Sequence, residues 1–117
     1  MSDTTTTVAE LRKLIREFVA ERNWEQFHTP KNLAMSISIE AAELMELFQW
    51  TDPAESARRA AVEPSRTRLA EELADVLCYA LSLANAADLD LSEAIRAKVQ
   101  KNRAKYPTEE FRDRFER

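Results

Sequence analysis

Glycine is missing altogether from this sequence of 117 residues, and proline occurs only four times. Tight turns that need the conformational freedom of glycine are therefore harder to build, which favours a helical chain. The absence also excludes the glycine-rich loops that cradle phosphates in nucleotide-binding α/β proteins. If this chain handles phosphate groups, it must use metal ions and cationic side chains instead.

Cysteine, histidine and long apolar runs are also scarce. Cys78 is the single cysteine, so no intramolecular disulfide can form, and this fits a reducing cytoplasm. No apolar run reaches the length of a membrane span, and residues 1–6 lack the apolar core of a signal peptide. The formal net charge of -4 gives no sign of a basic surface for nucleic acid. We therefore expect a cytoplasmic protein without membrane or nucleic-acid partners.

Helical periodicity and capping signals predict an all-α fold of one domain, spanning residues 7–107. Thr7 with Glu10, and Asp90 with Glu93, have the spacing of a capping box, and Thr29 precedes a proline at a helix start. The result is a four-helix bundle with helices at about 7–22, 30–51, 65–88 and 91–105.

The remaining segments are expected to be less regular. Residues 1–6 read as a disordered tail, and the polar connection over residues 52–64 leaves room for a helical turn near 54–60. Residues 108–117 form a C-terminal extension with room for a short helix, on which Phe111 and Phe115 are four residues apart.

The second helix is apolar around much of its circumference. One face carries Leu33, Ile37, Leu44 and Phe48, and further apolar surface comes from Met35, Ile39, Leu47 and Trp50. This distribution indicates either a central helix or an oligomer interface. The fourth helix is expected to bury Ile95 and Val99.

Two pairs of acidic residues, each three positions apart, lie inside apolar helices. Glu40 and Glu43 share one face of the second helix, and Glu72 and Asp75 share one face of the third. A single pair of this kind is common on a solvated face, but two pairs flanked by Leu, Ile, Val and Ala suggest four carboxylates that face one another. Buried carboxylates without partners are costly, so such a cluster needs a cation or a proton.

Oxygen ligands without histidine point to magnesium, with manganese as the alternative. Di-iron bundle proteins instead use Glu-x-x-His motifs. The single histidine, His28, lies in a predicted loop outside both acidic pairs, which argues against a di-iron site.

Other polar and aromatic residues permit two interpretations each. Trp24 and Phe27 either close one end of the bundle or line the site of a planar ligand. His28 also has a simpler interpretation, as a capping or surface residue. Lys98 and Asn102, four residues apart, form either an exposed polar stripe or a phosphate contact. We expect Cys78 to be a small buried apolar residue.

Five segments together resemble a known family. They cover residues 27–33 (Phe-His-Thr-Pro-Lys-Asn-Leu), 40–50 (Glu-Ala-Ala-Glu running into Glu-Leu-Phe-Gln-Trp), 71–77 (Glu-Glu-Leu-Ala-Asp-Val-Leu), 98–102 and 106–107. This pattern is similar to that of the all-α nucleoside triphosphate pyrophosphohydrolases, the MazG-like enzymes, and most closely to their dCTP pyrophosphatase branch. The resemblance covers about residues 10–107.

The resemblance implies a reaction and a set of residues for it. A nucleoside triphosphate, dCTP or a modified dCTP, would be hydrolysed by metal-activated water to the monophosphate and pyrophosphate, a role in sanitation of the nucleotide pool. It implies that catalysis and metal binding rest on Glu40, Glu43, Glu72 and Asp75. It implies that substrate is bound by Trp24, His28, Asn32, Trp50, Tyr79, Lys98 and Asn102.

The resemblance also implies a homo-oligomer, a dimer or tetramer, whose sites are shaped by helices of more than one subunit. One departure concerns the first helix, where relatives can carry a histidine and this chain has Ile15. The preferred base is therefore open. The competing hypothesis is a helical-bundle binding or scaffold module that has lost catalysis, against which the complete set of acidic residues argues.

Overall fold

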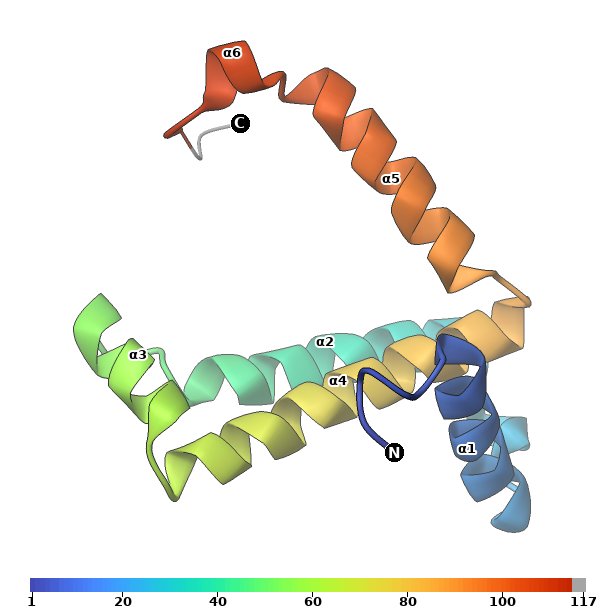
Figure 1. The fold of residues 1–117 in the computed structure, drawn as a ribbon. Coiled ribbons are helices and arrows are strands. Elements are labelled where there is room, and N and C mark those ends of the chain that lie inside the picture. Colours follow the sequence, from blue (N-terminus) through green and yellow to red (C-terminus); the bar gives the residue numbers. More distant parts are fainter. Residues whose placement is uncertain (115–117) are drawn as a thin grey trace.

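The computed structural model describes residues 1–114, and this part contains helices and connecting turns without a strand, which confirms the all-α class (Figure 1). The elements are α1 (Val8–Glu21), a 3-10 turn η1 (Glu25–Phe27), α2 (Pro30–Glu46), α3 (Pro53–Ala61), α4 (Ser65–Ala87), α5 (Leu91–Lys105) and α6 (Thr108–Phe111). The last part of the C-terminal extension, including Phe115, lies outside the described residues. None of the helices within residues 1–114 combines the length and apolarity needed to cross a membrane.

Side-chain caps begin three of the helices, as the sequence predicted. The Thr7 hydroxyl accepts the backbone N–H of Glu10 at 3.1 Å to start α1, and the Asp90 carboxylate accepts that of Glu93 at 2.9 Å to start α5. At the start of α2, the Thr29 hydroxyl accepts the backbone N–H of residue 32 at 3.2 Å. Each bond satisfies a donor that has no acceptor within its own helix.

Two helices end on a residue in the left-handed region, a position that glycine usually takes. Asn23 has φ 52° after α1, and Asp88 has φ 53° after α4. The backbone N–H of Leu89 then bonds to the carbonyl of Ala84 at 3.0 Å, which closes the end of α4. Asn and Asp tolerate this conformation better than other residues with a Cβ, so the chain caps its helices without glycine.

The second helix ends earlier than predicted: α2 stops at Glu46 instead of continuing to about residue 51. The cause lies in the next helix, because the Asp52 carboxylate caps α3 by accepting the backbone N–H of Glu55 at 2.8 Å. Residues 47–50 turn to reach that start. The carbonyl of Leu47, freed at the helix end, accepts a hydrogen bond from Arg59 of α3 at 2.9 Å.

The core lies where α1 and α3 meet the long pair formed by α2 and α4, which run side by side in opposite directions (Figure 1). Leu33 of α2 is 1% exposed and Ala84 of α4 is 2% exposed, and Val19 and Leu47 are also buried. The contact of α2 with α4 agrees with the expectation that the acidic pairs of these two helices face one another. This pairing is what brings the two acidic segments face to face.

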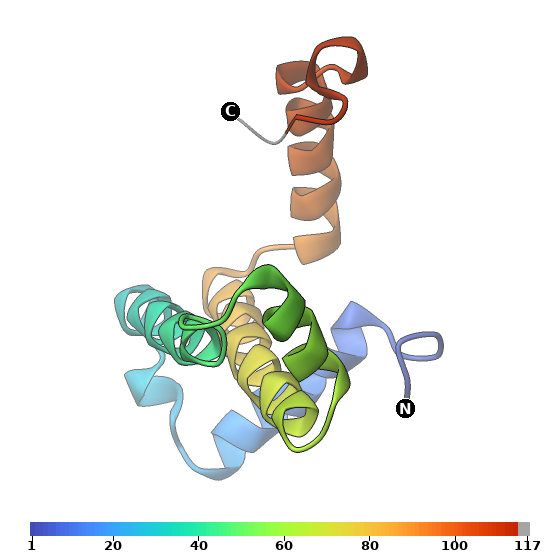
Figure 2. The same ribbon diagram turned by 90° about the vertical axis from the view of Figure 1, so that its left-hand side faces the viewer.

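The fourth predicted helix, α5, does not pack against the other helices of the same chain. Both views show it projecting away from the α2–α4 pair (Figures 1 and 2). Ile95 and Val99 are 60% and 41% exposed, so the prediction that α5 buries them is wrong within a single chain. The helix itself matches the predicted span.

Candidate active site

Three carboxylates from α2 and α4 converge where the two helices run together. Glu40 and Glu43 lie one turn apart on α2, and Glu72 lies opposite them on α4. One carboxylate oxygen from each residue lies within 4.8 Å of the other two. Glu40 and Glu72 are half-buried, whereas Glu43 is exposed. The i, i+3 spacing together with the pairing of the helices therefore produces a group of oxygens close enough to share one cation.

The cluster raises the pKa of its own members. Burial, a hydrogen bond with Glu43 and the charges of Glu43, Asp75 and Glu72 together raise the pKa of Glu40 to about 7. Burial, followed by the charge of Glu43 and a hydrogen bond with it, also raises the pKa of Glu72. Two carboxyl groups can hydrogen-bond only when one of them carries a proton, so the cluster needs a proton or a cation to hold together.

The donor set fits a divalent cation with a preference for oxygen. Glu40 Oε2 and Glu72 Oε2 are buried and have no hydrogen-bond partner within the part of the chain that the structure describes. Buried carboxylate oxygens without donors are costly unless a cation coordinates them. Carboxylate ligands alone, without His or Cys, are typical of magnesium, manganese and calcium sites.

The fourth predicted acid and a neighbouring cation lie at the edge of this cluster. Asp75 is exposed and does not belong to the close group of three, although its charge raises the pKa of both Glu40 and Glu72. Arg68, which the sequence analysis did not single out, acts in the opposite direction and lowers the pKa of Glu72. The sequence indicates this interaction, because Arg68 lies four residues before Glu72 on the same helix.

A pocket of about 200 Å³ collects four of the predicted substrate residues. It is lined by Trp24, Phe27, His28, Asn32, Leu33, Ser36 and Tyr79. Ser36 lies four residues before Glu40 on α2, and Tyr79 lies four residues after Asp75 on α4. Because four residues make about one helical turn, the pocket lies about one turn from Glu40 along α2 and about two turns from Glu72 along α4.

The aromatic residues of this pocket are positioned by α1 and by the link to α2. Trp24 packs edge-on against Phe18, with ring centroids 5.8 Å apart, and remains 43% exposed. The Asn32 side chain donates to the carbonyl of Phe27 at 3.1 Å, which fixes η1 against the start of α2.

Three other predicted substrate residues are not part of this arrangement within one chain. Trp50 follows α2 at its other end and is 90% exposed. Lys98 and Asn102 belong to α5, which projects away from the carboxylates (Figure 2). Cys78, predicted to be buried, is exposed.

A second pocket, of about 360 Å³, shares His28 with the first. Its lining consists of Ile15, Arg16, Val19, Glu25, His28, Ser82, Asn85 and Ala86. Ile15, the position of the departure noted in the sequence, thus borders the same region as the aromatic pocket. Ser82 is buried and provides a hydroxyl group in this wall.

Comparisons with known proteins identify relatives of this chain. Proteins named dCTP pyrophosphatase 1 from Rattus norvegicus and Homo sapiens are 46% and 44% identical to this chain over 101 residues. Each match covers 86% of this chain, which spans 59% of the length of each relative. A crystal structure of a pyrophosphatase from Archaeoglobus fulgidus is 43% identical, with a TM-score of 0.79, over 92% of this chain and 98% of that one.

The family comparison covers the acidic segments and α5. The MazG-like family matches residues 35–116, most of the chain and every carboxylate of the cluster. The resemblance noted in the sequence is thereby confirmed, and the chain belongs to the MazG-like family.

Proposed function

We propose that this protein is a nucleoside triphosphate pyrophosphohydrolase that converts dCTP or a modified dCTP to the monophosphate and pyrophosphate. The main observation is that an aromatic pocket lies about one helical turn from Glu40, in a carboxylate cluster of which two buried oxygens have no hydrogen-bond partner among the described residues. This arrangement supports a site for a planar base beside a site for a cation. Relatives named dCTP pyrophosphatase support the choice of nucleotide.

In this proposal Glu40, Glu43 and Glu72 hold a magnesium ion, with manganese as an alternative, and Asp75 completes the set from the next turn of α4. A divalent cation bound there offsets the charge of the triphosphate and lowers the pKa of a coordinated water. Without it, the carboxylates would repel the substrate.

The aromatic pocket orients the base and sugar, and α5 contributes to the phosphates. Trp24 and Tyr79 supply flat surfaces for stacking, while His28 and Asn32 supply polar groups at the pocket wall. Lys98 and Asn102 are assigned to the phosphate oxygens, and Trp50 to the base or sugar. Since these last three residues lie away from the pocket in one chain, we also propose that a second subunit completes the site.

A pyrophosphate-release assay tests this function directly. The purified chain is incubated with a panel of deoxynucleoside and nucleoside triphosphates and magnesium, and monophosphate and pyrophosphate are quantified together. We expect equal amounts of both products, fastest with dCTP or a modified dCTP. No release from any nucleotide would support the competing binding or scaffold module. The proposed cytoplasmic location is a separate prediction.

Glu43→Gln and Glu46→Gln form a matched pair for the same assay. Both residues are exposed on α2, but Glu46 does not belong to the cluster. Glu43→Gln is expected to lower turnover by about 100-fold or more, because metal positioning is lost, whereas Glu46→Gln keeps parental turnover. Equal activity of the two variants would remove the cluster from the mechanism.

A further inference from the structure

Two arginines of α1 are held together at a point remote from the carboxylate cluster. Arg12 Nε donates to Asn85 Oδ1 at 2.8 Å, and Arg16 Nη2 donates to the same oxygen at 3.0 Å. Asn85 Nδ2 donates back to the carbonyl of Arg12 at 3.2 Å, and Arg12 Nη1 donates to the carbonyl of Leu89 at 2.6 Å. The network joins α1 to the end of α4 and brings two guanidinium groups to one amide.

The charge of this arginine pair is not neutralised by a carboxylate. Neither guanidinium forms an ion pair within residues 1–114. An amide oxygen carries only a partial negative charge, so it offsets the repulsion between two full positive charges incompletely. Arg12 Nη2 and Arg16 Nη1 donate in none of the hydrogen bonds of the described residues, and both remain available to a ligand.

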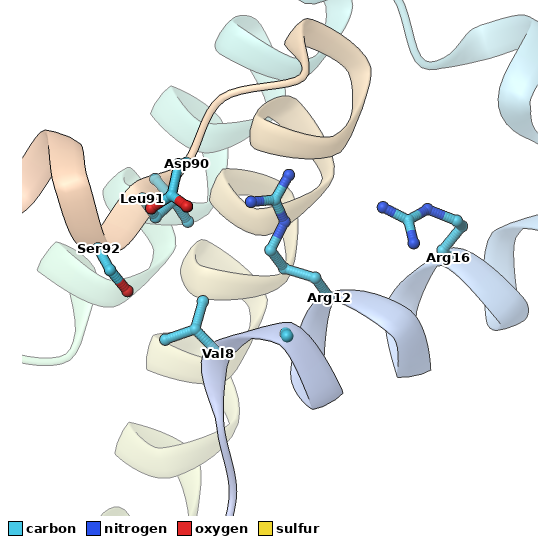
Figure 3. Close-up of a pocket in the computed structure, with 7 residues that line it drawn as sticks. Val8, Arg12, Arg16, Asp90, Leu91 and Ser92 are labelled. Carbon is cyan, nitrogen blue, oxygen red and sulfur yellow. The ribbon is translucent and has the colours of Figure 1, made fainter.

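The pair borders a cavity of about 250 Å³ between α1 and the start of α5, lined by Val8, Ala9, Arg12, Arg16, Asp90, Leu91 and Ser92. Figure 3 shows Arg12 extending from α1 toward the first residues of α5, with Arg16 beside it. The single acid of this lining, Asp90, is engaged as the cap of α5. Two arginines and one aspartate leave the lining with a net positive charge.

We propose that this cavity binds a phosphate-class oxyanion, such as inorganic phosphate or pyrophosphate, between the arginine pair and the start of α5. Guanidinium groups bind phosphate oxygens in a bidentate manner, and two of them give the charge that such an anion needs. Ser92, in the first turn of α5, adds a hydroxyl group to the same lining. Asn85 lies 13 residues beyond Glu72 on α4, about 20 Å along the helix, so this site is distinct from the metal cluster.

An anion in this cavity would connect α1 to α5. In this structure α5 projects away from the other helices (Figures 1 and 2). Binding would therefore restrict the direction of α5, the helix that carries Lys98 and Asn102. The anion site is thus a means of controlling where the proposed phosphate contacts lie.

Thermal melting of the full chain with pyrophosphate tests the proposal without depending on catalysis. A chelator removes metal from the carboxylates, and sodium chloride of equal ionic strength serves as the reference. The melting temperature is expected to rise with pyrophosphate and to saturate, because an anion that binds the folded state stabilises it. Arg16→Gln should weaken the apparent affinity at least tenfold, and Arg12→Gln should do the same.

Arg22→Gln is the matched control, since it removes the same charge from the region after α1 but not from the cavity. Glu43→Gln should respond as the parent does, which separates this site from the proposed active site. Arms with inorganic phosphate and dCMP show whether a free phosphate or a nucleotide phosphate binds, and a response to either supports the site. The proposal is overturned if no phosphate compound exceeds the sodium chloride reference, or if Arg16→Gln and Arg22→Gln respond alike. If Arg12→Gln does not fold, Arg16→Gln is compared with Arg22→Gln, because Arg16 is exposed.

Discussion

Glu40 is a carboxyl group whose pKa is raised by the fold. Burial is the main cause of its pKa of about 7, and the other carboxylates of the cluster add to it. The ordinary value for a glutamate is 4.5. In the absence of metal, the folded chain therefore holds a proton at Glu40 that the unfolded chain releases at lower pH.

This difference predicts how the metal-free protein responds to pH. Because the folded pKa is raised, the stabilising contribution is fully present below about pH 4.5 and is lost as the pH rises through about 7. In chelator, the melting temperature of the parent should fall between these values. Glu40→Gln, which keeps a neutral side chain at every pH, should reduce that fall, although Glu72 retains part of it. A variant with the parental pH dependence would contradict the assignment.

Substitutions of the two tryptophans should have different effects, because the two side chains have different surroundings in the fold. Trp24 packs against Phe18 and lines the aromatic pocket, whereas Trp50 is 90% exposed. Trp24→Ala should lower the melting temperature and raise KM for dCTP by about tenfold, the loss of one stacking contact. Trp50→Ala should leave stability unchanged within about 0.5 kcal/mol and raise KM alone. An unchanged KM in both variants would contradict the assignment of the two tryptophans to substrate binding.

At the scale of the element, the pairing of α2 with α4 determines the site. Leu33 is the most completely buried large side chain of the described residues. Leu33→Ala should cost about 2–5 kcal/mol of unfolding free energy, since a cavity remains where the side chain packed. Denaturant unfolding measures the loss, and Met35→Ala, at an exposed apolar position of the same helix, is the control. A loss of similar size in both variants would mean that Leu33 does not anchor the pair.

The sequence predicts these elements to different extents, for identifiable reasons. Capping side chains predict the starts of α1, α2 and α5, because such bonds are local. The start of α3 has the same kind of local cap, at Asp52. The early end of α2 at Glu46 is harder to predict, because the freed carbonyl of Leu47 is bonded by Arg59 of another helix. Whether α5 packs against other helices depends on residues far away in the sequence. Helical periodicity therefore predicts the helix but not the direction in which it projects.

Spacing also predicts part of the candidate site. Acidic residues three positions apart identify Glu40, Glu43 and Glu72, since one face of each helix must hold both members of a pair. The exposure of Asp75 depends on how α4 is rotated against α2, which the spacing does not determine, whereas the nearness of Arg68 to Glu72 follows from their separation of four residues on one helix. The contact of the two α1 arginines with the end of α4 cannot be predicted from a sequence pattern, because Asn85 lies more than 65 positions from both of them.

At the scale of the whole molecule, a single chain is more extended than a compact domain of the same length. The radius of gyration is 17.1 Å, compared with about 13 Å expected for a compact domain of this size. The accessible surface is 9378 Å², compared with about 6,500 Å² for a compact monomer of this mass. Exposed apolar side chains on α2, α4 and α5 include Met35 and Ile39, Leu73 and Leu77, and Ile95 and Val99.

These dimensions predict self-association through the apolar side chains of α2, α4 and α5. Ile95→Glu should shift the protein toward monomer in sedimentation velocity at micromolar concentration, because a charge replaces an apolar contact. Gln100→Glu, an equal charge change at a polar position of the same helix, should leave the assembly intact. Monomeric parent protein with full activity at that concentration would contradict the oligomer.

The outward direction of α5 has a consequence for mixtures of defective chains. If one subunit supplies the carboxylates and its partner supplies Lys98, Glu43→Gln and Lys98→Ala proteins, each inactive alone, restore function when they are unfolded and refolded together. In a dimer, half of the randomly paired molecules would carry one complete site, giving about a quarter of parental activity. Chains in which α5 folds back onto its own carboxylates show no such complementation, and their mixture stays inactive.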